Sequence, residues 1–260
     1  MNCFVASSLL KETQMQTVIA HSGAEALKAL QEKHFHVVLL DYMMPGMNGV
    51  ETLHKAKQLP NIGATRFIAL TATAISGSRE KFLREGFDNY LSKPMTGDDL
   101  TAMLHQYLPP ELIQQPLPSP APAPVEVKKP TSTADATPLI DPKLGLTYCN
   151  NMQAIYDKVL TLFHDQSTDR IAQMDLDLAR DNWQDYRINI HALKSTALTI
   201  GCRTLNQKAK EQEQAVKDYL TEDATASQQQ QAMDYIRKNH ADIMNLYRQA
   251  AALAVSQVAE

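Results

Sequence analysis

Residues 190–205 read IHALKSTALTIGCRTL, and the apolar side chains of this stretch decide how the second half of the chain folds. They recur at spacings of three and four, which places them on one face of a helix. Other segments of the second half repeat this spacing, so residues 139–256 are predicted to form an all-α antiparallel helical bundle. The apolar face in question is formed by Ile190, Leu193, Ala197 and Ile200.

His191 lies off this apolar face and is predicted to point toward solvent. Its helical neighbours three and four positions away include Arg187, Lys194 and Ser195. This set suits phosphoryl transfer, because a neutral imidazole is a nucleophile, cations offset phosphoryl charge and a small neighbour admits another active site. On spacing alone, a surface histidine without a function is the more common explanation.

The first half of the chain alternates strand and helix patterns. Short apolar segments are predicted to be strands at Thr17–Ala20, Val37–Leu40, Phe67–Leu70 and Asn89–Leu91. Helical patterns between them indicate a parallel α/β sheet that is covered by helices. Ligands bind beyond the carboxyl ends of the strands in such sheets. The last three strands are therefore expected to bring Asp41, Thr71 and Lys93 to one edge.

A proline-rich segment separates the two halves. Residues 109–138 hold nine of the thirteen prolines of the chain. Proline fixes the backbone angle φ and removes a hydrogen-bond donor, so this segment is predicted to be an extended spacer. The predicted organisation is a first domain at residues 1–108, a linker at 109–138 and a second domain at 139–256.

Composition excludes several classes of function. The net charge of −4 gives no basic surface for nucleic acid, and the longest apolar run is far below the ~18–20 residues of a membrane span. Three scattered cysteines and the lack of a signal peptide favour a cytoplasmic setting without membrane contact by this chain. No glycine-rich ATP-binding motif is found, so no kinase core is expected and the chain should not phosphorylate itself from ATP.

The second half resembles the histidine phosphotransfer (HPt) family. The family signature is His-x-Leu-Lys-Gly/Ser, then a small residue, then glycine and leucine ten and fourteen residues after the histidine. The matching positions here are His191, Leu193, Lys194, Ser195, Ala197, Gly201 and Leu205. The resemblance implies that His191 is the phosphoacceptor and that Lys194 and Ser195 support it, with Arg187 nearby on the same helix.

The first half resembles the receiver domain of response regulators, which has a flavodoxin-like fold. Asp41 begins the run DYMMPGMNG after one apolar strand, Thr71 follows the next strand, and Lys93-Pro94 follows the last. The resemblance implies that Asp41 is a phosphoacceptor whose phosphoryl group contacts Thr71 and Lys93. It also implies that Tyr90 is the switch aromatic residue and that the Lys93–Pro94 bond is cis.

One family feature cannot be placed in this sequence. Receivers begin with a strand that ends in two acidic residues, which bind Mg²⁺ together with the phosphoacceptor. Counting back from Asp41 runs past the first residue, and Asn2–Leu10 resembles the family's first helix. The receiver is therefore expected to lack its first strand and to retain only Asp41 and the Met43 carbonyl as Mg²⁺ ligands. Asp41 should then accept phosphate poorly.

Together the two resemblances imply a phosphorelay. His191 would accept a phosphoryl group from a receiver aspartyl phosphate and pass it to a response-regulator aspartate. The expected partners are receiver domains and an upstream histidine kinase, and the parent protein would be a hybrid sensor kinase, which could be membrane-anchored. Two alternatives remain open at this point: a phosphate-independent docking module for receivers, and a phosphatase-like drain of phosphate.

Overall fold

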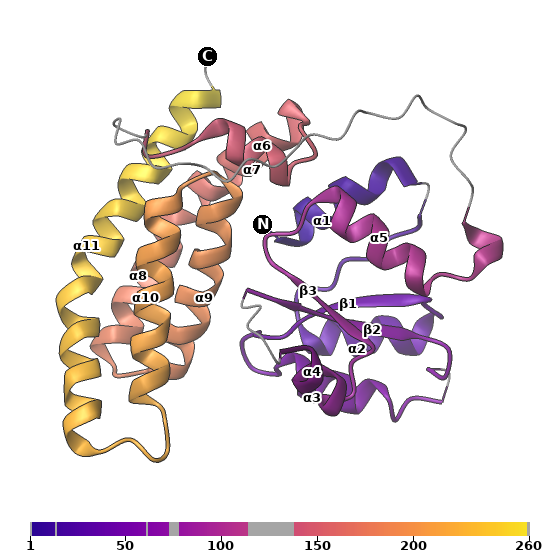
Figure 1. The fold of residues 1–260 in the computed structure, drawn as a ribbon, viewed down its shortest axis with the longest axis horizontal. Coiled ribbons are helices and arrows are strands. Elements are labelled where there is room, and N and C mark those ends of the chain that lie inside the picture. Colours follow the sequence, from indigo (N-terminus) through magenta and orange to yellow (C-terminus); the bar gives the residue numbers. More distant parts are fainter. Residues whose placement is uncertain (1, 14, 61, 73–77, 114–137, 259–260) are drawn as a thin grey trace.

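The computed structural model describes residues 2–13, 15–60, 62–72, 78–113 and 138–258. Figure 1 shows an α/β part formed by the first half of the chain beside a helical part formed by the second half. The α/β part consists of α1 (Asn2–Leu10), η1 (Lys11–Thr13), α2 (Gly23–Glu32), β1 (Val37–Asp41), α3 (Gly49–Ala56), β2 (Arg66–Thr71), α4 (Ser78–Glu85), β3 (Asn89–Ser92), α5 (Gly97–Tyr107) and η2 (Pro110–Leu112).

The described strands form one parallel sheet in the order β1-β2-β3. β2 is central, and its side chains alternate between two apolar clusters on opposite faces of the sheet. Phe67 and Ala69 pack with residues of α2, α3 and α4, whereas Ile68 and Leu70 pack with residues of α1 and α5. The predicted α/β fold with a parallel sheet is confirmed.

The predicted strand at Thr17–Ala20 is wrong. Residues 15–20 have no regular secondary structure, and Val18 and Ile19 are 54% and 45% exposed. A strand needs a neighbour for its backbone hydrogen bonds, and β1 pairs with β2 alone among the described strands. An apolar, β-branched segment without a paired neighbour therefore stays extended and exposed.

The helical part confirms the predicted all-α bundle. Its helices are α6 (Pro142–Tyr148), α7 (Gln153–Asp165), α8 (Ser167–Ala179), α9 (Trp183–Thr199), α10 (Arg203–Tyr219) and α11 (Ala226–Val258). Figure 1 shows α8, α9, α10 and α11 running alongside one another. The predicted apolar face of α9 is fully inside this core, since its four residues are at most 1% exposed.

Gly201 ends α9 and fixes how the bundle closes. Its φ of +85° lies in the left-handed region, which residues other than glycine adopt only at a cost in free energy. A Cβ at this position would also collide with the backbone carbonyl of Asp141, which caps α6. Glycine is therefore required at this point of the family signature.

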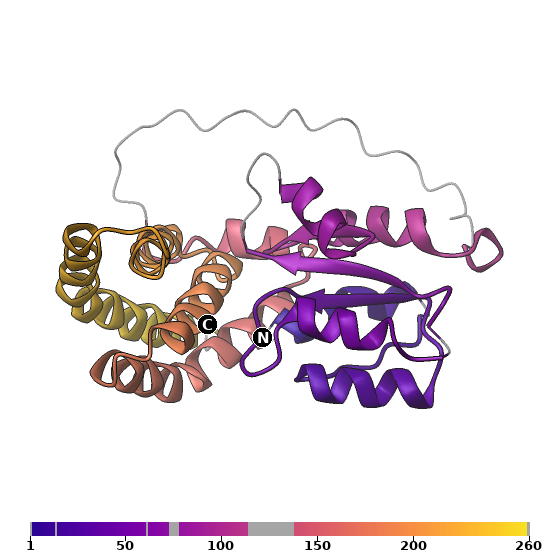
Figure 2. The same ribbon diagram turned by 90° about the horizontal axis from the view of Figure 1, so that it is seen from below.

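Helix α1 contacts both parts of the molecule. Val5 belongs to the apolar core of the helical part, whereas Leu10 belongs to the cluster between the sheet and α5. Helices α1 and α7 are in direct contact, and Figure 2 shows the carboxyl-terminal edge of the sheet facing the bundle. In the described part of the chain, no helix combines the length and apolar character needed to cross a membrane.

Candidate functional site

The strand ends bring the predicted residues of the first half together. Lys93 Nζ lies 2.7 Å from Asp41 Oδ2, and the Met43 amide donates to Asp41 Oδ1 at 3.2 Å. Thr71 is buried at the end of β2, and its carbonyl accepts a hydrogen bond from the Lys93 amide at 2.6 Å. The Lys93–Pro94 peptide bond is cis, as predicted.

The loop after Asp41 is held by the start of α3. Asn48 and Glu51 form a reciprocal capping box, and the Gly49 amide donates to the Tyr42 carbonyl at 3.2 Å. A Cβ on Gly49 would lie 2.9 Å from the Tyr42 Cα, so only glycine lets the helix begin this close to Asp41.

Tyr90, the predicted switch residue, lies in β3 and is partly buried. Its ring packs against the ring of Phe82 in α4, with centroids 5.4 Å apart. The structure thus places Tyr90 beside α4.

The described residues do not fit a complete Mg²⁺ site. Both Asp41 oxygens already accept hydrogen bonds, and no group of three or more histidine, cysteine or acidic side chains suited to a metal occurs in the described ranges. Mg²⁺ requires six oxygen ligands in near-octahedral geometry. A single engaged carboxylate supplies too few of them.

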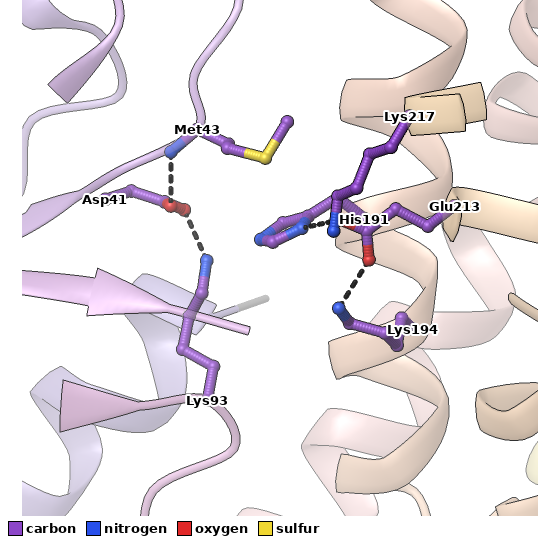
Figure 3. Close-up of polar contacts among 7 residues, drawn as sticks. All are labelled: Asp41, Met43, Lys93, His191, Lys194, Glu213 and Lys217. Carbon is purple, nitrogen blue, oxygen red and sulfur yellow. Dashed lines mark hydrogen bonds and ion pairs between the residues drawn. The ribbon is translucent and has the colours of Figure 1, made fainter. Parts of the chain in front are cut away.

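The expectation that His191 points into solvent is wrong. His191 is 3% exposed, and Figure 3 shows its ring directed at Asp41 and Lys93. The helical periodicity correctly placed His191 off the bundle's apolar face. The face of α9 that carries His191 is nevertheless covered, because the strand-end edge of the first half lies against it (Figure 3).

Glu213 of α10 organises the groups around His191. It is 1% exposed, and its carboxylate is 2.9 Å from His191 Nδ1, 2.9 Å from Lys217 Nζ and in a short contact with Lys194 Nζ (Figure 3). Burial alone would raise the pKa of Glu213, but the hydrogen bonds and charges of His191 and Lys194 outweigh it and lower the pKa. Glu213 is therefore ionised at neutral pH.

The same contacts define the state of the His191 ring. Burial lowers the pKa of His191, Glu213 opposes this effect, and the charges of Lys93 and Lys194 lower the pKa further. The net shift is downward, so the ring is neutral at pH 7. An ionised carboxylate only accepts hydrogen bonds, so the Nδ1 atom beside Glu213 carries the hydrogen and Nε2 holds a free lone pair.

Three polar atoms on one face of α9 have no hydrogen-bond partner among the described residues. They are Arg187 Nε, His191 Nε2 and Ser195 Oγ, all buried and spaced by four residues. Buried polar groups are nearly always satisfied in folded proteins, so such a row needs an explanation. Arg187 Nε and Ser195 Oγ can donate hydrogen bonds to the oxygens of a tetrahedral phosphoryl group, and the lone pair of His191 Nε2 can attack its phosphorus.

A second buried network holds α10 in the rotation that directs Glu213 at His191. Gln212 donates to the Tyr186 hydroxyl and to the Ile236 carbonyl, each at 2.9 Å. Tyr186 contacts His240 Nδ1 at 2.9 Å, and His240 Nε2 contacts Asp175 at 2.7 Å. These bonds connect α8, α9, α10 and α11, so His240, which has no evident role in the sequence, is part of the core.

Two family models match the chain: that of the response regulator receiver domain over residues 1–105, and that of the Hpt domain over residues 158–252. The chain contains a receiver domain followed by an Hpt domain. The receiver is the α/β part and the Hpt domain is the helical part. This pair of domains supports a role in phosphorelay signalling within two-component systems.

Several histidine kinases and sensor proteins are similar to part of the chain. The signal transduction histidine-protein kinase BarA of Escherichia coli K12 is 32% identical over 108 residues, which are 42% of this chain and 12% of that protein. The sensor protein GacS of Pseudomonas syringae is 30% identical over 106 residues, 40% of this chain and 12% of GacS. The aerobic respiration control sensor protein ArcB of E. coli K12 is 32% identical over 108 residues, 41% of this chain and 14% of ArcB. The chain thus matches a small fraction of each relative.

Among solved structures, the receiver domain of a sensor histidine kinase from Pseudomonas aeruginosa PAO1 is 25% identical. The match covers 41% of this chain and 87% of that one, with a TM-score of 0.38. That crystal structure has a magnesium ion coordinated in its active site cleft.

We expect Glu213→Gln to destabilise the Hpt domain by about 3–5 kcal/mol, because the buried Lys194 ammonium would lose its counter-charge. Urea unfolding followed by helical circular dichroism measures this loss. The neighbouring Glu211→Gln serves as a control, since Glu211 is exposed and a change of at most about 1 kcal/mol is expected there. Equal stabilities of the two variants would contradict the role assigned to Glu213.

Proposed function

We propose that this chain carries a phosphoryl group in a phosphorelay and that Nε2 of His191 is the atom that accepts it. The observation that supports this most is the buried, unpartnered Nε2 atom directed at the Asp41–Lys93 edge (Figure 3). A neutral imidazole nitrogen in this position is a ready nucleophile for an aspartyl phosphate.

The chemical step needs no proton transfer at His191. The Nε2 lone pair forms the phosphorus–nitrogen bond while the phosphorus–oxygen bond of the aspartyl phosphate breaks, and the carboxylate oxygen keeps the bonding electrons. The hydrogen on Nδ1 stays in place. The positive charge gained by the ring is stabilised by Glu213, 2.9 Å away.

The cations and donors around the ring have separate tasks in this proposal. Lys194 offsets the charge of the phosphoryl oxygens at His191. Arg187 and Ser195 donate hydrogen bonds to them, and the small Ser195 side chain leaves room for the group. Lys93 and Thr71 would contact a phosphoryl group carried by Asp41 of this chain.

In the second half of the relay, the phosphohistidine gives its phosphoryl group to the aspartate of a response regulator. The partners proposed here are receiver domains and an upstream histidine kinase. The similarity to histidine kinases and sensor proteins supports such a setting. We also propose the domain limits 1–108 and 139–256, joined by the linker at 109–138.

Asp41 is proposed to be a poor phosphoacceptor in this chain. It occupies the family's phosphoacceptor position, but among the described residues we assign only Asp41 and the Met43 carbonyl as oxygen ligands for Mg²⁺. Weak metal binding would leave Lys93 as the nearby positive charge for the oxygens of the phosphodonor while the Asp41 carboxylate attacks its phosphorus. The receiver of this chain would then affect His191 mainly by surface contact and not by transferring a phosphoryl group from Asp41.

His191→Gln is expected to abolish uptake of radiolabelled phosphate from a separate phosphorylated receiver. Wild-type label should be acid-labile and base-stable, as phosphohistidine is. His164→Gln is the control, since His164 lies on α7 and its ring Nδ1 contacts the Ala251 carbonyl at 3.0 Å. Undiminished labelling of His191→Gln would refute the assignment, and unchanged signalling by it in cells would favour docking without phosphate.

We expect Asp41 to be labelled slowly by a small acyl phosphate, with little gain on adding Mg²⁺. An intact receiver that has its acidic pair, treated in parallel, gives the fast reference rate. Asp41→Asn gives the background, because the amide cannot accept the phosphoryl group. Rapid Mg²⁺-dependent labelling that disappears in Asp41→Asn would contradict the expectation.

A further inference from the structure

His191 is covered by the receiver domain of its own chain. The Hpt helices alone would leave the outer face of α9 open, because that face lies opposite the apolar residues of the bundle core. In the structure His191 is 3% exposed, and the positive charge of Lys93 is close enough to lower the pKa of its ring. The Asp41–Lys93 edge lies directly in front of the His191 ring (Figure 3).

Helix α1 holds this arrangement in place. A surface helix normally has one apolar face, but α1 reads NCFVASSLL and is apolar on several sides. Val5 is 7% exposed and packs in the Hpt core, with Phe4 against the same core, whereas Leu10 packs under α5 of the receiver. Separating the two domains would expose Val5 and Phe4 to water, which costs free energy.

A second contact lies away from α1. A Cβ on Gly97, the first residue of α5, would lie 3.1 Å from side-chain atoms of Asn150, which follows α6 in the Hpt domain. The backbone of α5 therefore lies so close to the Hpt domain that a side chain at this position would require Asn150 to shift. Lys93 and Ala72 of the receiver also line one pocket together with Lys194 and Ser195 of α9.

We propose that the receiver domain caps the His191 face and that α1 and the Gly97–Asn150 contact hold the cap. The inference rests on the proposed role of His191 and adds a partner relation to it. A receiver on another molecule must displace the cap before it reaches Nε2. The cap and the external receiver compete for one surface, so the apparent rate of external transfer scales with the uncapped fraction.

Two variants of the full chain open the cap from different sides. Val5→Asp would place a charge in the apolar contact of α1, and Gly97→Arg would wedge a side chain against Asn150. Their matched controls carry the same new residue at open positions. Cys3→Asp is on the exposed side of α1, and Gly63→Arg has free space around its Cβ.

The readout is modification of His191 by diethyl pyrocarbonate, mapped by peptide mass spectrometry, with exposed His34 as an internal reference. We expect the rate at His191 to rise about tenfold or more in Val5→Asp and Gly97→Arg, and to stay at the wild-type value in both controls. Circular dichroism checks folding. If Val5→Asp has a lower helical content than the wild type, the Gly97→Arg variant alone decides whether the cap exists.

Wild-type His191 reacting as fast as His34, or no acceleration in a folded Gly97→Arg variant, would overturn the cap. Transfer from an external phosphorylated receiver is measured on the same variants and should accelerate in parallel. Faster chemical modification together with no phosphoryl uptake in any variant would uphold the cap and refute the proposed function instead.

Discussion

The Glu213 carboxylate, buried between α9 and α10, governs the chemistry of the Hpt domain. A buried charge is tolerated only when it is paired and fully hydrogen-bonded, and Glu213 meets this condition through His191, Lys194 and Lys217. Each of these partners is in turn fixed by the carboxylate. One buried acid therefore sets the position of the imidazole, the ring nitrogen that carries the hydrogen and the position of the nearby ammonium groups, whereas burial keeps the ring neutral.

The arrangement leaves His191 with one reactive atom and one direction of approach. Nδ1 is engaged by Glu213, so Nε2 faces outward from the bundle toward the Asp41–Lys93 edge (Figure 3). The receiver occupies that direction, and α1 joins the two apolar cores. Chemistry at the histidine and contact between the domains thus use the same surface.

Sequence patterns predict what the periodicity of one segment or the regular geometry of a parallel sheet determines, and they fail where the packing of distant segments decides the outcome. The predicted strand ends correctly brought Asp41 and Lys93 together, because the carboxyl ends of parallel strands lie at the same edge of a sheet. Helical periodicity placed His191 on the outer face of α9, but it carries no information on what covers that face. Glu213 had no evident role, since its pairing with α9 depends on packing, and Thr17–Ala20 has strand-like residues without a strand to pair with.

The most direct test is the ¹⁵N NMR spectrum of the His191 ring in the full chain, recorded as a function of pH. We expect a neutral ring at pH 7 with the hydrogen on Nδ1, an unprotonated Nε2, and a pKa below 6.5. A hydrogen on Nε2, or a pKa above 6.5, would show that Glu213 does not leave Nε2 free as the nucleophile.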